Sequence, residues 1–483
     1  MNAAFSAHST LGALIIALLQ VAPLSAQPAP GDQPRGRVVD KIACAGNPEE
    51  TYALYLPSSY SPDRPWPILY ILDPRSRGAL AAERFRAGAE AFGYILASSN
   101  NSMSDGPMEP NLKAMRAIWA DTHARFTIDD RRHYAAGFSG TVRSSVVLAR
   151  SAPGSLAGIV GAGAGWPFDQ PPQKGDRFVF YGTVGDKDFN YYEMMDLEPK
   201  LADAGANYRL EIFDGLHQWP PAEIATRALA WLDLQAMKAG TIPKDASRID
   251  AAWNETTGRA RAFEQSGDLF QASRTWSGAA ADFAGLRDTA EAQKKATELA
   301  ANPALQRELK EREERLRHDK VVLAQAPGIL AAVNPSGEAR TVAQVVALLK
   351  IHELRKKADS APTADERLSA QRILNTLQVQ TGFYLPQTFA ERKQHDREIF
   401  VLSIATEIDP KSSTVYYSRA AAYAKKGDRK RALADLRQAA ENGWKDRTVI
   451  DRDKDFDGLR QDAEFKQLVQ SLGGTAPAPG RQP

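Results

Sequence analysis

The chain has 483 residues, of which 43% are hydrophobic and 25% charged, so it can bury more than one sizeable core and two domains are expected. Its 61 basic and 59 acidic residues nearly cancel, which gives no support for a nucleic acid or an anionic membrane as partner. A single cysteine, Cys44, excludes an internal disulfide and argues against a thiolate-rich zinc site.

The N-terminus has the pattern of a secretion signal peptide over residues 1–26. The apolar run LGALIIALLQVA precedes Ser25 and Ala26, a small-residue pair of the kind found before a cleavage site. The run is too short to span a bilayer, and the residue directly after the cleavage point is Gln27 and not a cysteine that could carry a lipid. We therefore expect a periplasmic or secreted protein with no integral membrane anchor, opening with a disordered leader over residues 27–35. A buried N-terminal helix is the alternative.

Residues 36–240 alternate between strand-like and helix-like segments. The strand-like segments, in chain order, are GRVVDKIA, ETYALYLP, PWPILYILDP, FGYILASS, RRHYAAGF, LAGIVGAG, RFVFYGTV and YRLEIF. The helix-like segments are 83–91, 111–125, the stretch after Ser139, 193–204 and 222–238. The first two strands have the pattern of an antiparallel pair, and the later alternation predicts a mostly parallel sheet with helices on both faces.

The segment AAGFSGTVR, residues 135–143, is typical of the sharp turn that presents a nucleophilic serine. Ser139 lies where a predicted strand passes directly into a predicted helix, as this nucleophile elbow requires. The usual pattern is GxSxG, and Thr141 occupies its last position. Gly137 and Gly140 leave room for the strand and helix to pass closely, and the backbone N–H of Gly140 lies where an oxyanion would develop. A plain strand-to-helix turn is the alternative.

A serine hydroxyl needs a base to remove its proton, and in this kind of fold the chain order is serine, acid, histidine. His123 and His133 precede Ser139, so His217 is the candidate in this region. It lies in FDGLHQWPP, just after the last predicted strand, at the sheet edge that the elbow occupies. Trp219, two residues later, could line the substrate cleft or pack behind His217.

The acid that orients the histidine is expected in GDKDFN, directly after the strand RFVFYGTV. This segment offers Asp186 and Asp188. We favour Asp188, because it lies three positions after Gly185 and can clear the strand end, whereas Asp186 could cap the next helix or turn. Asn100, Asn101 and Ser102 also follow a strand end and could border the site, although we expect them to form a solvated loop.

The motifs GFSGTVR, GDKD and GLHQWP, in this order, resemble those of secreted α/β-hydrolase serine esterases, especially the polyhydroxybutyrate depolymerase and feruloyl or acetyl esterase-like branch. The resemblance covers residues 36–240. It implies an α/β-hydrolase domain with Ser139 as nucleophile, Asp188 as orienting acid and His217 as general base and acid.

The resemblance also implies a second oxyanion donor in the loop after the third strand. That loop is LDPRSRG in this chain. Pro74 has no N–H, so the backbone of Arg75 or Ser76 would have to donate beside Gly140.

Alanine-rich amphipathic segments without convincing strands follow a linker at residues 241–248 and continue over residues 249–472. The segment STVYYSRAAAYAKKGDRKRALADLRQAAENG resembles a tetratricopeptide helix pair, and AFEQSGDLFQASRTWSGAA repeats part of its pattern. The matching positions are Tyr416, Ala420, Tyr423, Gly427, Ala432, Leu436 and Ala439 in the first, and Phe263, Gly267, Asp268, Ala272, Trp276 and Ala279 in the second. We expect a tetratricopeptide-like array that binds a protein or peptide, with a disordered tail over residues 473–483. Helices that only cover the hydrolase domain are the alternative.

Together these features predict an exported serine esterase that works through an acyl-enzyme, with no metal and no cofactor. No HExxH, CxxC or P-loop motif occurs. The short intervals between the three motifs leave little room for a lid, which favours an open cleft and a bulky or polymeric ester substrate. Two alternatives are a binding scaffold with a catalytically idle hydrolase domain, and an acyltransferase that uses the same three residues.

Overall fold

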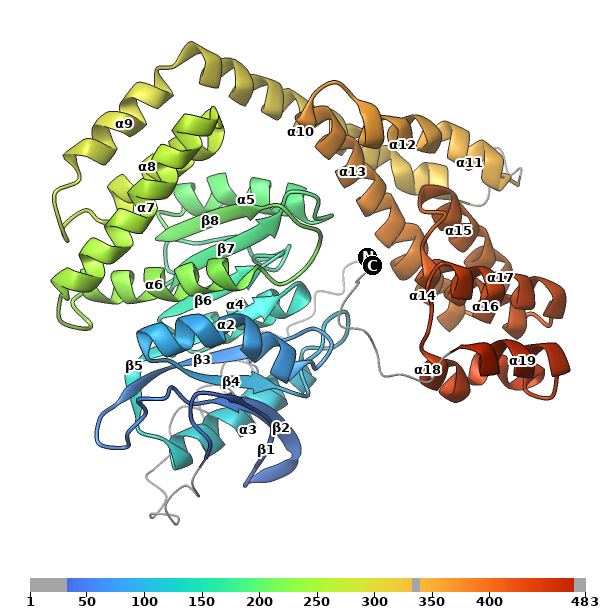
Figure 1. The fold of residues 1–483 in the computed structure, drawn as a ribbon, viewed down its shortest axis with the longest axis horizontal. Coiled ribbons are helices and arrows are strands. Elements are labelled where there is room, and N and C mark those ends of the chain that lie inside the picture. Colours follow the sequence, from blue (N-terminus) through green and yellow to red (C-terminus); the bar gives the residue numbers. More distant parts are fainter. Residues whose placement is uncertain (1–32, 332–338, 473–483) are drawn as a thin grey trace, which may run out of the picture. The chain divides into compact units, whose positions relative to one another are not determined.

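The computed structural model describes residues 33–331 and 339–472, which form two compact units (Figure 1). The first unit runs through Asp186 and resumes over Asn190–Glu311, and the second comprises Lys187–Phe189 and the chain from Arg312 onward. The predicted signal peptide, most of the predicted leader and the predicted tail lie outside the described residues. Among the described helices, none combines the length and the apolar character needed to cross a bilayer.

The first unit is built on an eight-stranded sheet with the order β1-β2-β4-β3-β5-β6-β7-β8. The strands are β1 Val38–Cys44, β2 Asn47–Tyr55, β3 Trp66–Leu72, β4 Ile95–Ser99, β5 Ile128–Phe138, β6 Gly158–Ala162, β7 Val179–Gly185 and β8 Tyr208–Phe213. Strand β2 pairs antiparallel with β1 and β4, and every other pairing is parallel. This confirms the predicted mostly parallel sheet with its antiparallel opening pair.

Helices cover both faces of the sheet. They are α2 Gly78–Phe92, α3 Glu109–Arg125, α4 Gly140–Ser151, α5 Tyr191–Asp203 and α6 Ala222–Lys238. Strand β3 is buried on both faces of the sheet, and its successive side chains point alternately to one face and the other. Leu69 and Ile71 share a core with α2 and α6, whereas Ile68 and Tyr70 share one with α3. This two-sided burial explains why β3 is a continuous apolar run.

Three further helices belong to the first unit, although the sequence assigned them to a separate helical domain. These are α7 Ala246–Ser266, α8 Leu269–Asp282 and α9 Ala290–Ala300. Leu234 and Met237 of α6 share one apolar core with Trp253 of α7 and Trp276 of α8. The predicted boundary at residue 240 was therefore wrong, because α6 needs α7 and α8 to cover its apolar side.

Ion pairs fix α7 and α8 to the sheet and its helices. Arg274 of α8 binds both carboxylate oxygens of Glu198 in α5, at 2.7 and 2.8 Å. Arg209 of β8 pairs with Asp282 at the end of α8. Helix α8 has Gly278 at the position where the Arg209 guanidinium packs against it, so no side chain obstructs this contact.

From the C-terminal part of α10 Pro303–Leu330 to α19, the described elements of the second unit are all helices, and its segment Lys187–Phe189 lies outside any helix or strand. Its other elements are α11 Val342–Leu348, α12 Ile351–Ser360, α13 Ala364–Val379, the π-helix η1 Gln380–Tyr384, α14 Leu385–Glu391, α15 His395–Ile408, α16 Ser413–Lys425, α17 Arg429–Glu441, α18 Arg447–Arg452, the 3₁₀ helix η2 Lys454–Leu459 and α19 Ala463–Ser471. Figure 1 shows these helices in orange and red.

Both predicted helix pairs form, each with the expected glycine turn. Gly427 ends α16 with a φ of +80°, and Asp428 caps α17. Gly267 ends α7 with a φ of +79°, and Asp268 caps α8. The two pairs fall in different compact units, so residues 249–472 are not one array. A kinship of α16 and α17 with tetratricopeptide repeats stays a prediction.

Candidate active site

Ser139 occupies a strained turn between β5 and α4. Its φ of +54° and ψ of −134° lie where residues with a side chain are rarely found. The Ser139 N–H donates to the carbonyl of Ala162 at the end of β6, at 2.8 Å, and its own carbonyl accepts from Val142 at 3.0 Å. The strained residue is thus held on both sides, as expected for a nucleophile elbow.

The two glycines around Ser139 are required by close contacts. A Cβ atom on Gly137 would lie 2.6 Å from the backbone nitrogen of Val142, where strand and helix cross. A Cβ atom on Gly140 would lie 2.7 Å from the Cβ atom of Ser104. Gly140 is also the first residue of α4, where backbone N–H groups have no partner within the helix. Its N–H is therefore suited to an oxyanion, as the sequence predicts.

Thr141 replaces the last glycine of the usual pattern and has a structural task of its own. Its side chain is fully buried, and its hydroxyl donates to the carbonyl of Leu72 at the end of β3, at 2.6 Å. The same oxygen accepts from the backbone N–H of Phe138, at 2.9 Å. The threonine thus ties the elbow to the neighbouring strand.

Replacing Thr141 by valine should destabilise the first unit by about 1–3 kcal/mol, because the buried N–H of Phe138 loses its acceptor. Thr141→Ser keeps the hydroxyl and should cost less. Urea unfolding of both variants measures the difference. Equal stability of Thr141→Val and the wild type would show that this hydroxyl does not support the elbow.

His217 lies beside the elbow, on the loop between β8 and α6. Its imidazole packs against the ring of Phe138, with 4.6 Å between centroids and 38° between planes. The loop crosses the end of β7 so closely that a Cβ atom on Gly185 would lie 2.3 Å from the carbonyl oxygen of Gly215. The structure therefore places His217 next to the residue that precedes Ser139.

The two candidate acids occupy different positions. The Asp186 N–H donates to the carbonyl of Phe213 at 2.7 Å, and its Oδ1 accepts from the N–H of Gly215 at 3.1 Å. Asp186 thus fixes the backbone of the loop that carries His217, a turn role like the one the sequence suggested. Asp188 is fully buried. Its role as the orienting acid stays a prediction.

Trp219 lies in the core, with only 3% of its surface exposed. Its ring packs on Phe85 and Phe138, at centroid distances of 5.7 and 5.6 Å. Its Nε1–H donates to Asp73 Oδ2 at 2.8 Å. The suggestion that Trp219 binds substrate is therefore wrong, because packing and this hydrogen bond hold it beneath the His217 loop.

Asp73, which the sequence analysis missed, organises the loop after β3. Its Oδ1 accepts from the backbone N–H of Arg75 at 2.9 Å, and its carboxylate pairs with Arg77. The N–H of Ser76 donates to the Asp73 carbonyl at 3.2 Å. Both predicted second oxyanion donors thus carry other hydrogen bonds in this structure, which corrects their assignment. The signal in the sequence was an aspartate before Pro-Arg, a pattern typical of a side chain that accepts from the backbone two residues later.

The loop after β4 lies against the elbow instead of being solvated as predicted. Ser102 is fully buried, and its hydroxyl donates to the Asp73 carbonyl at 2.8 Å. The side chain of Asn111 in α3 makes two hydrogen bonds to the backbone of Met103. Its Oδ1 accepts from the Met103 N–H at 2.8 Å, and its Nδ2 donates to the Met103 carbonyl at 2.7 Å. These contacts hold Ser104 against Gly140, so this loop borders the candidate site.

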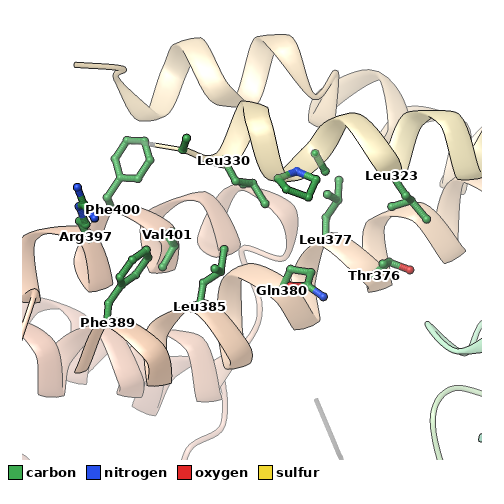
Figure 2. Close-up of a pocket in the computed structure, with 13 residues that line it drawn as sticks. Leu323, Leu330, Thr376, Leu377, Gln380, Leu385, Phe389, Arg397, Phe400 and Val401 are labelled. Atoms are coloured by element: carbon green, nitrogen blue, oxygen red, sulfur yellow. The ribbon is translucent and has the colours of Figure 1, made fainter. Parts of the chain in front are cut away.

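The second unit contains a separate hollow of about 470 Å³ (Figure 2). It is lined largely by apolar side chains from α10, α13, α14 and α15, among them Leu323, Leu377, Leu385, Phe389 and Phe400. The exposed side chain of Arg397 also borders it. A hollow of this size and lining suits an apolar ligand or side chain. A protein or peptide partner for the helical unit stays a prediction.

No family model matches the sequence, and no curated protein matches it. Among solved structures, the chain is similar to S-formylglutathione hydrolase FrmB from Staphylococcus aureus, with 16% identity over 42% of this chain and 99% of that chain and a TM-score of 0.33. It is similar to Est1E from Butyrivibrio proteoclasticus, with 13% identity over 41% and 98% and a TM-score of 0.32. It is also similar to an esterase from Pyrobaculum calidifontis, with 13% identity over 47% and 91% and a TM-score of 0.33. Similarities this distant carry no argument about the chemistry of the site, which rests on the geometry above.

Proposed function

We propose that the protein is an exported serine hydrolase that cleaves carboxylic esters through an acyl-enzyme. The observation that carries the proposal is the backbone of Ser139, strained at the start of α4 and held from both sides. Backbone angles of this kind are less favourable than those of an ordinary turn by about 1–3 kcal/mol. They are therefore kept mainly where function requires them. In an elbow, the strained angles expose the serine Oγ above the sheet edge.

The proposed mechanism assigns one task to each residue. His217 takes the proton of Ser139 as Oγ attacks the ester carbonyl, and Asp188 fixes the imidazole and stabilises its charged form. The backbone N–H of Gly140, at the positive end of α4, holds the developing oxyanion. The protonated His217 gives its proton to the leaving alcohol, and a water activated by the same histidine then releases the acid.

Two contacts support these assignments over the alternatives. The ring of His217 packs on Phe138, so the base lies beside the nucleophile's own neighbour. The carboxylate of Asp186 accepts from the backbone N–H of Gly215, and we therefore assign the orienting role to Asp188. The open cleft and the bulky or polymeric ester are proposed from the short intervals between the motifs.

A binding scaffold with an idle hydrolase unit is the second candidate, and the hollow in the helical unit favours it. The two proposals differ in whether Ser139 is chemically reactive. An organophosphonate probe reacts only with an activated serine, so labelling of the purified protein distinguishes them.

We expect the probe to attach to Ser139, with labelling abolished in Ser139→Ala and greatly reduced in His217→Gln. Ser151→Ala, at the end of the same helix α4, is the matched control and should label like the wild type. A folded wild type that stays unlabelled would refute the enzyme proposal and favour the scaffold. Product analysis on esters of increasing acyl length separates hydrolysis from acyl transfer, and cell fractionation tests export.

A further inference from the structure

A second cluster of polar side chains lies at the far end of β5 from Ser139. His133 of β5 and His123 in the last turn of α3 face each other, with 3.2 Å between their Nε2 atoms. Asp130 Oδ1 lies 3.9 Å from each of these nitrogens. Five residues of extended strand lie between His133 and Ser139, a span of roughly 20 Å, so this cluster is distinct from the candidate active site.

A hydrogen bond of His123 fixes where the proton of this ring lies. His123 Nδ1 lies 2.8 Å from the carbonyl oxygen of Trp119, and a carbonyl only accepts, so the proton is on Nδ1. The Nε2 atom of His123 is then left with a lone pair that faces His133 Nε2.

His123 Nε2, His133 Nε2 and the Asp130 carboxylate all lie within 4.8 Å of one another, a spacing at which three side chains can share one metal ion. A neutral imidazole whose Nε2 has a lone pair is the form in which histidine binds metal ions. His123 is in this form, and His133 reaches it when its proton is on Nδ1.

The geometry points to a divalent metal site, with zinc as the best-suited ion, formed by His123 Nε2, His133 Nε2 and the Asp130 carboxylate. Nitrogens about 2.1 Å from one ion and 3.2 Å from each other subtend an angle of about 100°, close to tetrahedral. Two histidines and one carboxylate, with water in a fourth position, are ligands that zinc accepts. This inference goes beyond the proposed function and does not depend on it.

The surroundings of Asp130 leave it available to the ion. Its neighbours Arg131 and Arg132 pair with Asp129, at 3.5 and 2.8 Å, so they do not neutralise Asp130. The Asp130 side chain is 84% exposed and can close the remaining distance by a small rotation. The solvent that surrounds it supplies the water ligand.

The surroundings of the two rings hold them in place. The indole of Trp119 stacks on His123 at 4.7 Å between centroids and contacts His133 at 4.4 Å. His123 Nδ1 bonds to the backbone carbonyl of Trp119, which is the usual outer support of a metal-bound histidine. The ion would therefore clip α3 to β5, the strand that leads to Ser139. His123 and His133 belong to no recognised zinc spacing, which is why the sequence analysis predicted no metal.

The experiment uses the full chain, purified without a histidine tag and stripped with a chelator. Calorimetric titration with zinc should show one site in the wild type. Free zinc at about 100 times the dissociation constant should raise Tm by about 5 °C, because the ion binds only the folded protein. His123→Gln should weaken binding at least about 100-fold, and Asp130→Asn about 10-fold. His352→Gln, an exposed histidine of α12, is the matched control and should bind like the wild type.

Asp130→Asn keeps the test valid if a change at a buried histidine impairs folding, since this side chain is exposed. Cobalt, added in place of zinc, should give the visible absorption of a tetrahedral site in the wild type and not in His123→Gln. Absence of zinc binding by the folded wild type would overturn the proposal. Binding that is unchanged in both His123→Gln and Asp130→Asn would overturn it as well.

Discussion

Replacing Ser139 by glycine is expected to make the protein more stable and to abolish ester cleavage. The φ of +54° and ψ of −134° lie in a region that only glycine occupies without strain. Relief of strain on the order of 1–3 kcal/mol outweighs the roughly 0.5–1 kcal/mol that glycine's greater freedom in the unfolded chain costs. The net gain should be about 1 kcal/mol in the free energy of unfolding, measured by urea titration.

Loss of the Ser139 hydroxyl should lower kcat by about 10⁵–10⁶-fold, in the range expected when a catalytic serine is removed. Ser139→Ala keeps the strained angles and should lose the same activity without the gain in stability. Ser151→Gly, at the last residue of α4, should not raise the stability, because Ser151 has no positive φ that glycine would relieve. A Ser139→Gly variant less stable than Ser139→Ala would show that the elbow holds no strain.

The sequence was sufficient to predict the sheet and the elbow because both depend on local patterns. Strand β3 appears as a continuous apolar run since both of its faces are buried. Gly137 is needed at a crossing of strand and helix that the alternation of segments already implied. The position of His217 followed from the order of the chain, since the loops after parallel strands gather at one edge of a sheet.

Contacts between distant segments decided what the sequence could not predict. The place of Trp219 in the core depends on its hydrogen bond to the Asp73 carboxylate, 146 positions away. The turn at Gly267 predicts a helix pair but not the surface that the pair covers. That surface is determined by contacts such as the ion pair between Arg274 and Glu198, which a local sequence pattern does not reveal. Side-chain hydrogen bonds over long intervals thus account for most of the corrections.

Two shortened forms of the chain test the correction of the domain boundary. Residues 33–311 should fold and unfold cooperatively, whereas residues 33–240 should remain unfolded or aggregate. The shorter form exposes Leu234 and Met237, which now share a core with Trp253 and Trp276. Two such side chains are worth about 1.5–3 kcal/mol each. The measurement is circular dichroism with thermal unfolding.

The form that ends at residue 240 also loses ion pairs, which lowers its stability further. Glu211 of β8 is largely buried, between Arg227 of α6 and Arg259 of α7. Burial alone would raise the pKa of Glu211, but these arginines hold it below its ordinary value. The ion pairs of Glu211 with these arginines therefore stabilise the fold fully above the pKa of an unfolded glutamate, about 4.3. This contribution is lost as the pH falls through the lower pKa that Glu211 has in the folded protein.

Truncation at residue 240 removes Arg259 and also the Asp282 partner of Arg209. Glu211 keeps Arg227, and the removal of α7 and α8 opens Glu211 and Arg209 to solvent, so the lost ion pairs add to the loss of apolar burial without leaving a buried charge unpaired. If residues 33–240 instead unfold cooperatively with the same Tm as residues 33–311, α7 and α8 do not contribute to the stability of the first unit. Glu211→Gln in the full chain is the matched point variant, and it should lose the acid-dependent part of the stability while the fold persists.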